Sequence, residues 1–185
     1  MSTRLPGTTI EVSEIKASCS KIMFDGIFAA GGITLSQVSV MTDLEPHVIQ
    51  NWVKRGFVSS PRNRQYSKNQ FARIVIINML RESLQLDSIC SLLSHINGDL
   101  KDESDDLIDD CELYHKYVDM LSDIDKETLD KTAVRGAAEK ICRDYNEPRA
   151  GAGERLCRVL QVMAFAHLSQ RCKRNAEEIL SALDR

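Results

Sequence analysis

The stretch LEPHVIQNWVKRGFV, residues 44–58, contains the start, the apolar face and the end of one short helix. Pro46 is favoured in a first helical turn, and Gly56 is a natural residue at a helix end. Four apolar residues recur at helical spacing between them: Val48, Ile49, Trp52 and Val53. The stretch therefore predicts a helix over about 45–55 with a polar outer side, and Trp52 is expected in the core.

A second short helix is expected immediately before this stretch. Residues 34–42, TLSQVSVMT, carry spaced apolar residues, and Thr34 or Ser36 can cap the helix start with a side-chain oxygen. Asp43 lies in the turn that follows. Two short helices separated by three or four residues have the spacing of a helix-turn-helix.

The residues after the stretch predict an extended element and two further helices. Residues 61–66, PRNRQY, are basic and weakly hydrophobic, which indicates a β-hairpin or wing that Tyr66 anchors with its hydroxyl at the surface. Ser67 is expected to cap an apolar helix over about 68–83, and another helix is expected over 86–96.

The flanking regions are also predicted to be helical. Helices are expected over residues 10–28, from about Asp105, from about Lys126 to Asn146, and over 154–183. The expected fold class is mainly α, a winged helix-turn-helix domain with a small β-wing followed by a helical C-terminal domain. The expected parts are an N-terminal helical extension, the winged domain, an acidic joint, and a helical dimerisation or effector domain, over residues 1–30, 31–96, 97–112 and 113–185.

The composition is that of an ordinary soluble globular protein, with 185 residues, 43 % hydrophobic and 28 % charged. No apolar run approaches the roughly 20 residues of a membrane-spanning helix, and the first residues lack the apolar segment of a signal peptide. The six cysteines have no zinc-finger spacing, and free thiols in a cytoplasmic protein are expected. The net charge of −3 divides into +3 for residues 31–96 and −6 for 97–185, which suggests two separate tasks.

Binding to duplex DNA requires cations on one surface and polar side chains that reach base edges. The helix over 45–55 offers such a stripe at positions i, i+3, i+4 and i+7, and the wing and the next helix start add cations. The candidate DNA-binding residues are His47, Gln50, Asn51, Lys54, Arg55, Arg62, Arg64, Tyr66 and Lys68. The alternative for the helical stripe is an ordinary solvated helix face.

Residues 33–96 resemble the winged helix-turn-helix domain of MerR-type bacterial regulators. The resemblance lies in the order of a short helix, a turn, a helix ending in RGFV, a wing with RQYS, and two helices with MLRESLQLDSI. It implies DNA binding, and Arg64 and Tyr66 match the wing of that family. Gln50, Asn51 and Trp52 stand where MerR-type proteins usually carry an Arg and two aromatics. The whole chain is similar to a YkrK-like family of bacterial proteins, a name that implies no activity.

Enzymatic and metal-binding interpretations have weaker support. Four acids of the joint, Asp102, Asp105, Asp106 and Asp109, can share a helical face and hold a divalent cation, but such charge runs are usually solvated. Cys111 and His115 are four residues apart, and two ligands do not close a metal site. No motif for catalysis or for a nucleotide cofactor occurs, so neither an enzyme nor a cofactor is expected.

The expected partners are double-stranded DNA and a second copy of the chain, with no membrane and with an unidentified small-molecule effector. A single helix-turn-helix of low charge binds weakly and gains affinity by pairing two half-sites. The helix over 154–183 is the candidate dimer interface, and its alternative is packing against the helices over 105–121 and 126–146. The competing function is a protein-interaction or scaffold module that keeps the winged fold and has lost DNA affinity.

Overall fold

Helices dominate the structure, a computed structural model that describes residues 3–98, 100, 106–124 and 130–183. The described helices are α1 (Cys19–Ile27), α2 (Leu35–Thr42), α3 (Pro46–Lys54), α4 (Lys68–Leu80), α5 (Leu86–Asn97), α6 (Asp110–Asp123), α7 (Lys131–Cys142) and α8 (Ala152–Leu183). The described strands are β1 (Thr3–Arg4), β2 (Glu11–Val12), β3 (Ile33–Thr34) and β4 (Gln65–Tyr66). The predicted mainly helical class with little strand is therefore confirmed.

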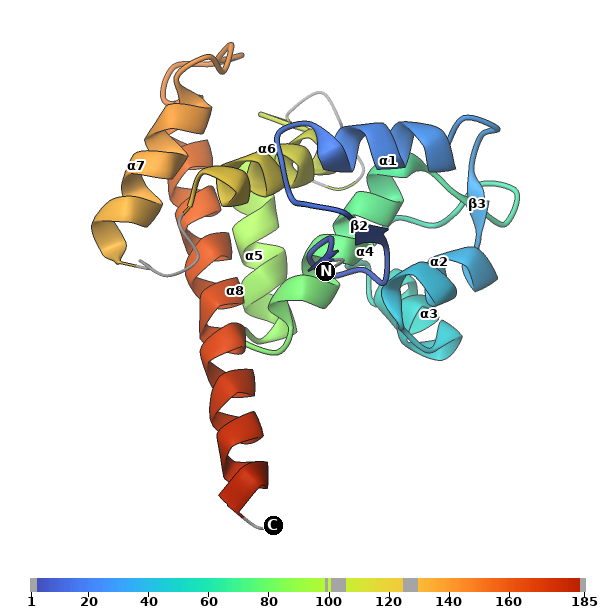
Figure 1. Ribbon diagram of the computed structural model, residues 1–185. Coiled ribbons are helices and arrows are strands. Elements are labelled where there is room, and N and C mark those ends of the chain that lie inside the picture. The colour runs from blue at the N-terminus through green and yellow to red at the C-terminus, as the bar shows by residue number, and fades with distance from the viewer. Residues whose placement is uncertain (1–2, 99, 101–105, 125–129, 184–185) are drawn as a thin grey trace.

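Helix α4 lies at the centre of the fold (Figure 1), and its residues 71–77 are all buried. Ser67 begins the helix with a capping box, in which its side chain accepts from the backbone of Gln70 and the Gln70 side chain accepts from the backbone of Ser67. The Phe24 ring of α1 packs against Phe71 of α4 and Tyr114 of α6, with centroid distances of 5.1 and 5.2 Å. One apolar core therefore joins the N-terminal and C-terminal halves, while the expected division into four parts stays a prediction.

The expected pair of short helices is present as α2 and α3. Thr34 caps α2 with a capping box, and Pro46 occupies the first turn of α3 as predicted. Asp43 ends α2 in the left-handed conformation, with φ of 55°. Short polar side chains tolerate this conformation better than other non-glycine residues do, so the turn between the helices follows from local chemistry.

Two antiparallel strand pairs connect these helices. Strand β3 pairs with β4, with Ile33 opposite Tyr66 and Thr34 opposite Gln65. Because β3 leads directly into α2 and β4 leads directly into α4, this two-residue sheet fixes the starts of both helices. Strand β1 pairs with β2 at the N-terminus, where a helix was expected.

The prediction of a helix over 10–28 was therefore wrong in its first half. Residues 3–12 form the β1–β2 pair and dock onto the central helices, since the Tyr114 hydroxyl donates to Pro6 O at 2.8 Å. Gly7 has φ of 73°, and a Cβ there would lie 2.4 Å from Val75 O of α4. These long-range contacts hold the segment extended, and α1 begins only at Cys19.

The C-terminal half consists of α6, α7 and α8, with two boundaries that differ from expectation. Helix α6 starts at Asp110, not near 105, because the Asp109 side chain accepts from Glu112 N at 2.7 Å and caps it there. Helix α7 ends at Cys142, before the expected end at Asn146, and the expected start at Lys126 lies outside the described residues.

Helix α8 is longer than the body it packs against. Figure 1 shows its second half extending beyond the rest of the molecule. The first half is packed, with Leu156, Leu160 and Met163 buried, whereas every residue from 171 to 183 is exposed. None of the described helices is both long and apolar enough to cross a membrane.

Candidate nucleic-acid interface

Helix α3 exposes the predicted polar stripe. His47, Gln50, Asn51 and Lys54 are all exposed. Ile49 and Trp52, on the opposite side, are buried, as expected for Trp52. Side chains at i, i+3, i+4 and i+7 share one helix face, so the four polar groups form a ridge that is open to solvent in this chain.

The hairpin after α3 carries two exposed arginines at its tip. Gln65 N donates to Arg62 O at 2.9 Å across a two-residue loop. The loop residues Asn63 and Arg64 both have positive φ, 50° and 62°. This pattern is that of a type I′ turn, which favours Asn and Gly. An arginine in the left-handed region costs about 1–2 kcal/mol relative to glycine's freedom there, so Arg64 occupies a strained position.

The base of the hairpin is held by Gln70 of α4. Its amide Nε2 donates to Ser59 O at 2.9 Å and to Ser60 O at 3.0 Å, while its Oε1 accepts in the capping box. The same side chain thus fixes the start of α4 and the start of the hairpin. The side chains of Arg62 and Arg64 have no hydrogen-bond or ion-pair partner among the residues that the structure describes, which leaves both guanidinium groups available.

Two of the expected cations have protein partners. Lys68 Nζ lies 2.7 Å from Asp25 Oδ1 of α1. This hydrogen bond raises the pKa of Lys68 and lowers the pKa of Asp25. Arg55 lies 3.7 Å from Asp87 of α5 and stacks over the Phe57 ring at 4.4 Å. Lys68 and Arg55 would have to leave or share these partners to contact a phosphate, so they are weaker candidates than Arg62 and Arg64.

Tyr66 is a correction to the predicted set. Its side chain is only 3 % exposed, and burial raises the pKa of its hydroxyl. Pairing with Ile33 across the β3–β4 sheet turns the ring into the core. Tyr66 therefore anchors the hairpin as expected, but it exposes too little surface to be a main contact for DNA.

The Cys111–His115 pair forms a structural contact. Cys111 Sγ lies 3.1 Å from His115 Nε2, and His115 Nδ1 lies 2.8 Å from Ser20 Oγ. Burial raises the pKa of Cys111 to about 12 and lowers the pKa of His115. The thiol thus stays protonated at neutral pH, which does not suit a nucleophile.

Acidic cation sites are also unsupported in the described part of the chain, where no group of three potential ligands gathers. Asp109 serves as the cap of α6. Asp102 and Asp105, two of the other acids weighed from the sequence, lie outside the described residues.

Sequence reasoning missed a buried ion pair beneath the hairpin. Arg73 of α4 contacts Asp110 of α6, with Nη1–Oδ2 of 3.1 Å, and its Nε donates to Phe57 O at 2.7 Å. Asn97 Nδ2 also donates to Asp110 Oδ1 at 2.9 Å. Burial raises the pKa of Asp110, and Arg73 opposes that rise. The lone Arg within the apolar run of α4 was the signal for this network.

One family model matches the chain, described as a domain of unknown function (DUF1836), over residues 22–134. No curated protein and no solved structure matches. The resemblance to MerR-type regulators was therefore wrong, since no MerR or helix-turn-helix family is found. The DUF1836 match also replaces the YkrK-like assignment. The motifs behind the resemblance, such as RGFV after a capped helix, are short and arise wherever a short helix ends at glycine before an apolar step.

Proposed function

The chain belongs to the DUF1836 family, and from its geometry we propose that it is a DNA-binding transcriptional regulator. In this proposal α2, the turn and α3 act as a helix-turn-helix, with α3 in the major groove. The hairpin over 61–66 acts as a wing against the phosphate backbone. The observation that carries the proposal is the pair of arginines at the strained hairpin tip that follows α3, whose side chains have no hydrogen-bond or ion-pair partner among the described residues.

The strain at Arg64 supports a functional reason for the arginine. A glycine or asparagine would fit the turn with less strain, and the exposed Arg64 side chain has no hydrogen-bond or ion-pair partner among the described residues. Strained backbone that the fold does not require is frequent at binding sites. A cation at the tip of an exposed hairpin suits contact with a phosphate or entry into the minor groove.

The ridge of α3 suits base contacts. Gln50 and Asn51 carry side-chain amides that can both donate to and accept from adenine, and Lys54 can contact phosphate or guanine. Their partner-free, exposed positions on a helix with a well-packed underside would allow insertion without refolding. Ridge contacts would supply sequence preference, whereas the hairpin arginines would supply affinity for any duplex.

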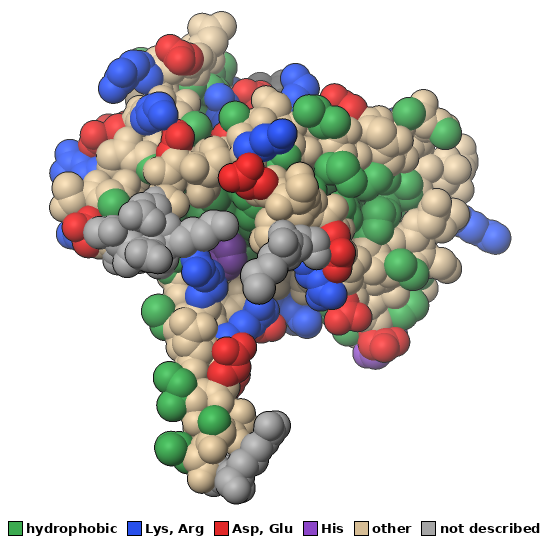
Figure 2. Space-filling view, viewed as in Figure 1, with side chains coloured by type: hydrophobic (Ala, Val, Ile, Leu, Met, Phe, Trp, Pro, Cys, Tyr) green, Lys and Arg blue, Asp and Glu red, His purple; other side chains and the backbone are tan. Residues whose placement is uncertain are grey.

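A homodimer is part of the proposal, because one small cationic site binds duplex DNA weakly. Along α8 a stripe of small and apolar residues repeats at alternating spacings of three and four: Val162, Phe165, Ser169, Cys172, Ala176, Ile179 and Leu183. A sustained 3.5-residue period is the pattern of a coiled coil. Ile179 and Leu183 are 66 % and 76 % exposed, and Figure 2 shows hydrophobic side chains along one side of the projecting end of α8.

The two interpretations made from the sequence, packing within the chain and pairing with a second copy, apply in this proposal to different halves of α8. Its first half packs within the chain, against α5 and α7 among others. Arg174, near the start of its projecting half, lies 3.9 Å from Glu82. Further along, Ile179 and Leu183 are exposed, and pairing with a second copy would bury them, worth roughly 1.5–3 kcal/mol for each side chain. A dimer joined there would hold two α3 ridges on one assembly.

The direct test is a binding titration with a random-sequence duplex at several salt concentrations. The variant Arg62→Ala/Arg64→Ala should lose affinity, and the slope of log K against log salt should fall by about two, since each phosphate contact contributes about 0.9. The control Arg143→Ala/Arg155→Ala removes the same charge from exposed positions of the C-terminal half and should leave the slope nearly unchanged. Native protein without salt-dependent duplex binding would overturn the proposal.

Sequence preference has its own test. Selection of bound duplexes from random DNA should recover an inverted repeat if the protein binds as a dimer. Gln50→Ala and Asn51→Ala should change the recovered bases without changing the salt slope. Recovery of unrelated sequences with native protein would remove the ridge from the proposal.

A second candidate is a protein-interaction module with the same fold. The engagement of Lys68 and Arg55 by acids, together with the net charge of −3, favours it. The titration above separates the two candidates, because an interaction module predicts no loss on removal of Arg62 and Arg64.

A further inference from the structure

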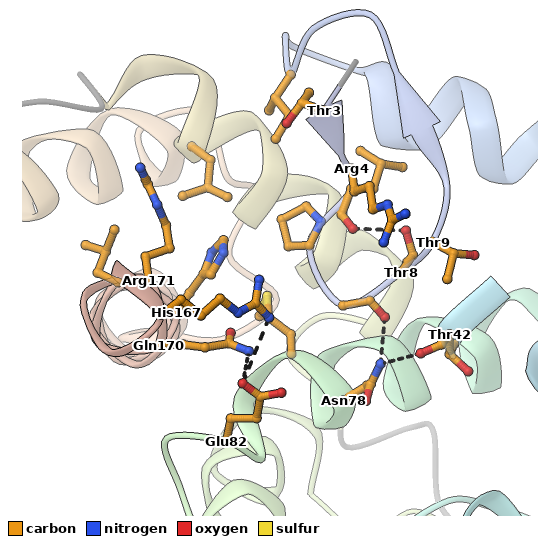
Figure 3. A pocket seen from close by; sticks show the side chains of 18 of the residues that line it. Thr3, Arg4, Thr8, Thr9, Thr42, Asn78, Glu82, His167, Gln170 and Arg171 are labelled. Atoms are coloured by element: carbon orange, nitrogen blue, oxygen red, sulfur yellow. Dashed lines mark hydrogen bonds and ion pairs between the residues drawn. The ribbon is translucent and has the colours of Figure 1, made fainter. Parts of the chain in front are cut away.

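A cavity of about 460 Å³ lies between the N-terminal segment, the end of α4 and the middle of α8. Figure 3 shows His167 and Gln170 of α8 on one side and Arg4 and Thr8 of the N-terminal segment on the other. This volume falls within the roughly 300–1,000 Å³ of small-molecule sites. The cavity is separate from the ridge of α3 and from the hairpin. It could not be predicted from the sequence, because its walls are far apart along the chain.

The charges that line the cavity are mainly positive. Four arginines line it, Arg4, Arg81, Arg171 and Arg174, against two acids, Asp43 and Glu82. Arg174 lies 3.9 Å from Glu82, and Glu82 also accepts a hydrogen bond from the Gln170 amide. Arg4 lies 4.0 Å from Glu11. The side chains of Arg81 and Arg171 have no ion-pair or hydrogen-bond partner among the described residues, so the described lining of the cavity carries net positive charge.

His167 shows the effect of this charge. Its Nδ1 lies 2.6 Å from the hydroxyl of the buried Tyr117. Burial, together with the nearby charges of Arg171 and Arg174, lowers the pKa of His167 to about 4. The imidazole is therefore neutral at physiological pH. Burial raises the pKa of Tyr117 well above its usual range, so its hydroxyl keeps its hydrogen. In the tautomer in which Nδ1 accepts from this hydroxyl, Nε2 carries a hydrogen and has no hydrogen-bond partner among the described residues.

Part of the remaining wall is apolar, beside threonines and Asn78. Leu5, Ile15, Leu121, Ile124 and Leu168 come from the N-terminal segment, α6 and its end, and α8. An inorganic ion alone would leave these apolar side chains in contact with water, whereas an apolar group attached to the anion would cover them. The lining thus has a cationic side for a head group and an apolar side for a body.

We propose that this cavity binds a small organic anion, a carboxylate or a phosphate monoester joined to a short apolar group. Arg171 pairs with the anionic head through its guanidinium fork, which suits both head groups. The Nε2–H of His167 donates to the same head group, and the leucine and isoleucine wall covers the apolar body. The free arginine and the neutral histidine lie one helical turn apart on α8, so they present to one ligand.

The position of the cavity links it to the proposed DNA-binding unit, and this step rests on the proposed function. Asn78 Nδ2 donates both to Gly7 O, at 3.0 Å, and to Thr42 O at the end of α2, at 2.8 Å (Figure 3). Thr9 N donates to Met41 O at 2.8 Å. A ligand held between residues 3–9 and α8 therefore stiffens the segment that contacts the turn before α3, as an effector would.

The test measures binding to the full-length protein without DNA, so its failure is distinct from failure of DNA binding. Calorimetric titrations near neutral pH use n-butyl phosphate, hexanoate and inorganic phosphate as probes. One of the two amphipathic probes should bind saturably, at least about tenfold tighter than inorganic phosphate. Tighter binding of n-butyl phosphate indicates a phosphate monoester as the natural ligand, and tighter binding of hexanoate indicates a carboxylate.

Arg171→Gln should weaken that binding by at least about tenfold, and Arg155→Gln, an exposed arginine on the same helix outside the cavity, should leave it unchanged. Arg171→Lys keeps the charge and should retain binding within a few-fold, which separates loss of the site from loss of folding. The proposal is overturned if neither amphipathic probe saturates below about 10 mM, or if the Gln variant binds like the native protein.

Discussion

Replacing Arg64 by glycine separates the stability of the hairpin from its proposed contact with DNA. With φ of 62° at this position, removal of the side chain relieves about 1–2 kcal/mol of left-handed strain. Glycine loses about 0.5–1 kcal/mol more conformational entropy on folding. The net expectation is a protein stabilised by about 0.5–1 kcal/mol, which raises the melting temperature by roughly 1–4 °C for a chain of this length.

The same variant should bind DNA less well. Loss of one phosphate contact lowers the salt slope by about 0.9 and weakens binding about five- to tenfold near 0.1 M salt. Thermal unfolding by circular dichroism and fluorescence anisotropy with a labelled duplex measure the two effects. Asn63→Gly is the matched control, because it changes the neighbouring turn residue without removing charge. An Arg64→Gly protein that is less stable, or that binds duplex with native affinity and salt slope, would refute the reasoning.

Three further outcomes are expected. Ile179→Asp should raise the dissociation constant of the proposed dimer at least about tenfold in sedimentation analysis, since it places a charge in the apolar stripe. Ser181→Asp, on another side of α8, should leave that constant unchanged. A native protein that is monomeric at all concentrations contradicts the interface. Arg73→Met should lower the free energy of unfolding by about 3–5 kcal/mol in chemical denaturation, because it leaves Asp110 buried without its ion-pair partner. The double variant Arg73→Met/Asp110→Leu should recover most of this loss. Equal losses in both variants would count against this account. His167 has a folded-state pKa of about 4, below its ordinary value of 6.5, so the unfolded state binds more protons between these values and stability falls as pH drops from 6.5 to 4. That loss is about 3 kcal/mol and should disappear in His167→Gln, whereas parallel stability curves for the two proteins would exclude it.

Local chemistry made several elements predictable. The caps of α2 and α4 and the proline of α3 are set by residues within one turn of each helix start, so Thr34, Pro46 and Ser67 marked those starts. The outward position of the α3 ridge followed from the spacing of apolar residues beneath it. These features depend on neighbours in sequence, which a single chain displays.

Features set by distant contacts were not predictable in the same way. The β1–β2 pair replaced an expected helix because Pro6 and Gly7 accept hydrogen bonds from Tyr114 and Asn78, which lie 108 and 71 positions away along the chain. The partners of Lys68 and Arg55 lie 43 and 32 positions away along the chain. The cavity beside α8 combines five separated segments. Alternating polarity and helical periodicity contain no information on these pairings.

The hairpin is held in place at both of its ends, and this has a further consequence. Gln70 holds Ser59 and Ser60, and β3 holds Gln65 and Tyr66, so only residues 61–64 lie between two fixed points. Natural variation or deliberate grafting can lengthen, shorten or recharge these four residues while the scaffold on either side keeps its shape. The protein thus carries a four-residue hairpin tip that can be exchanged, and relatives with the same helices can differ in what this tip contacts.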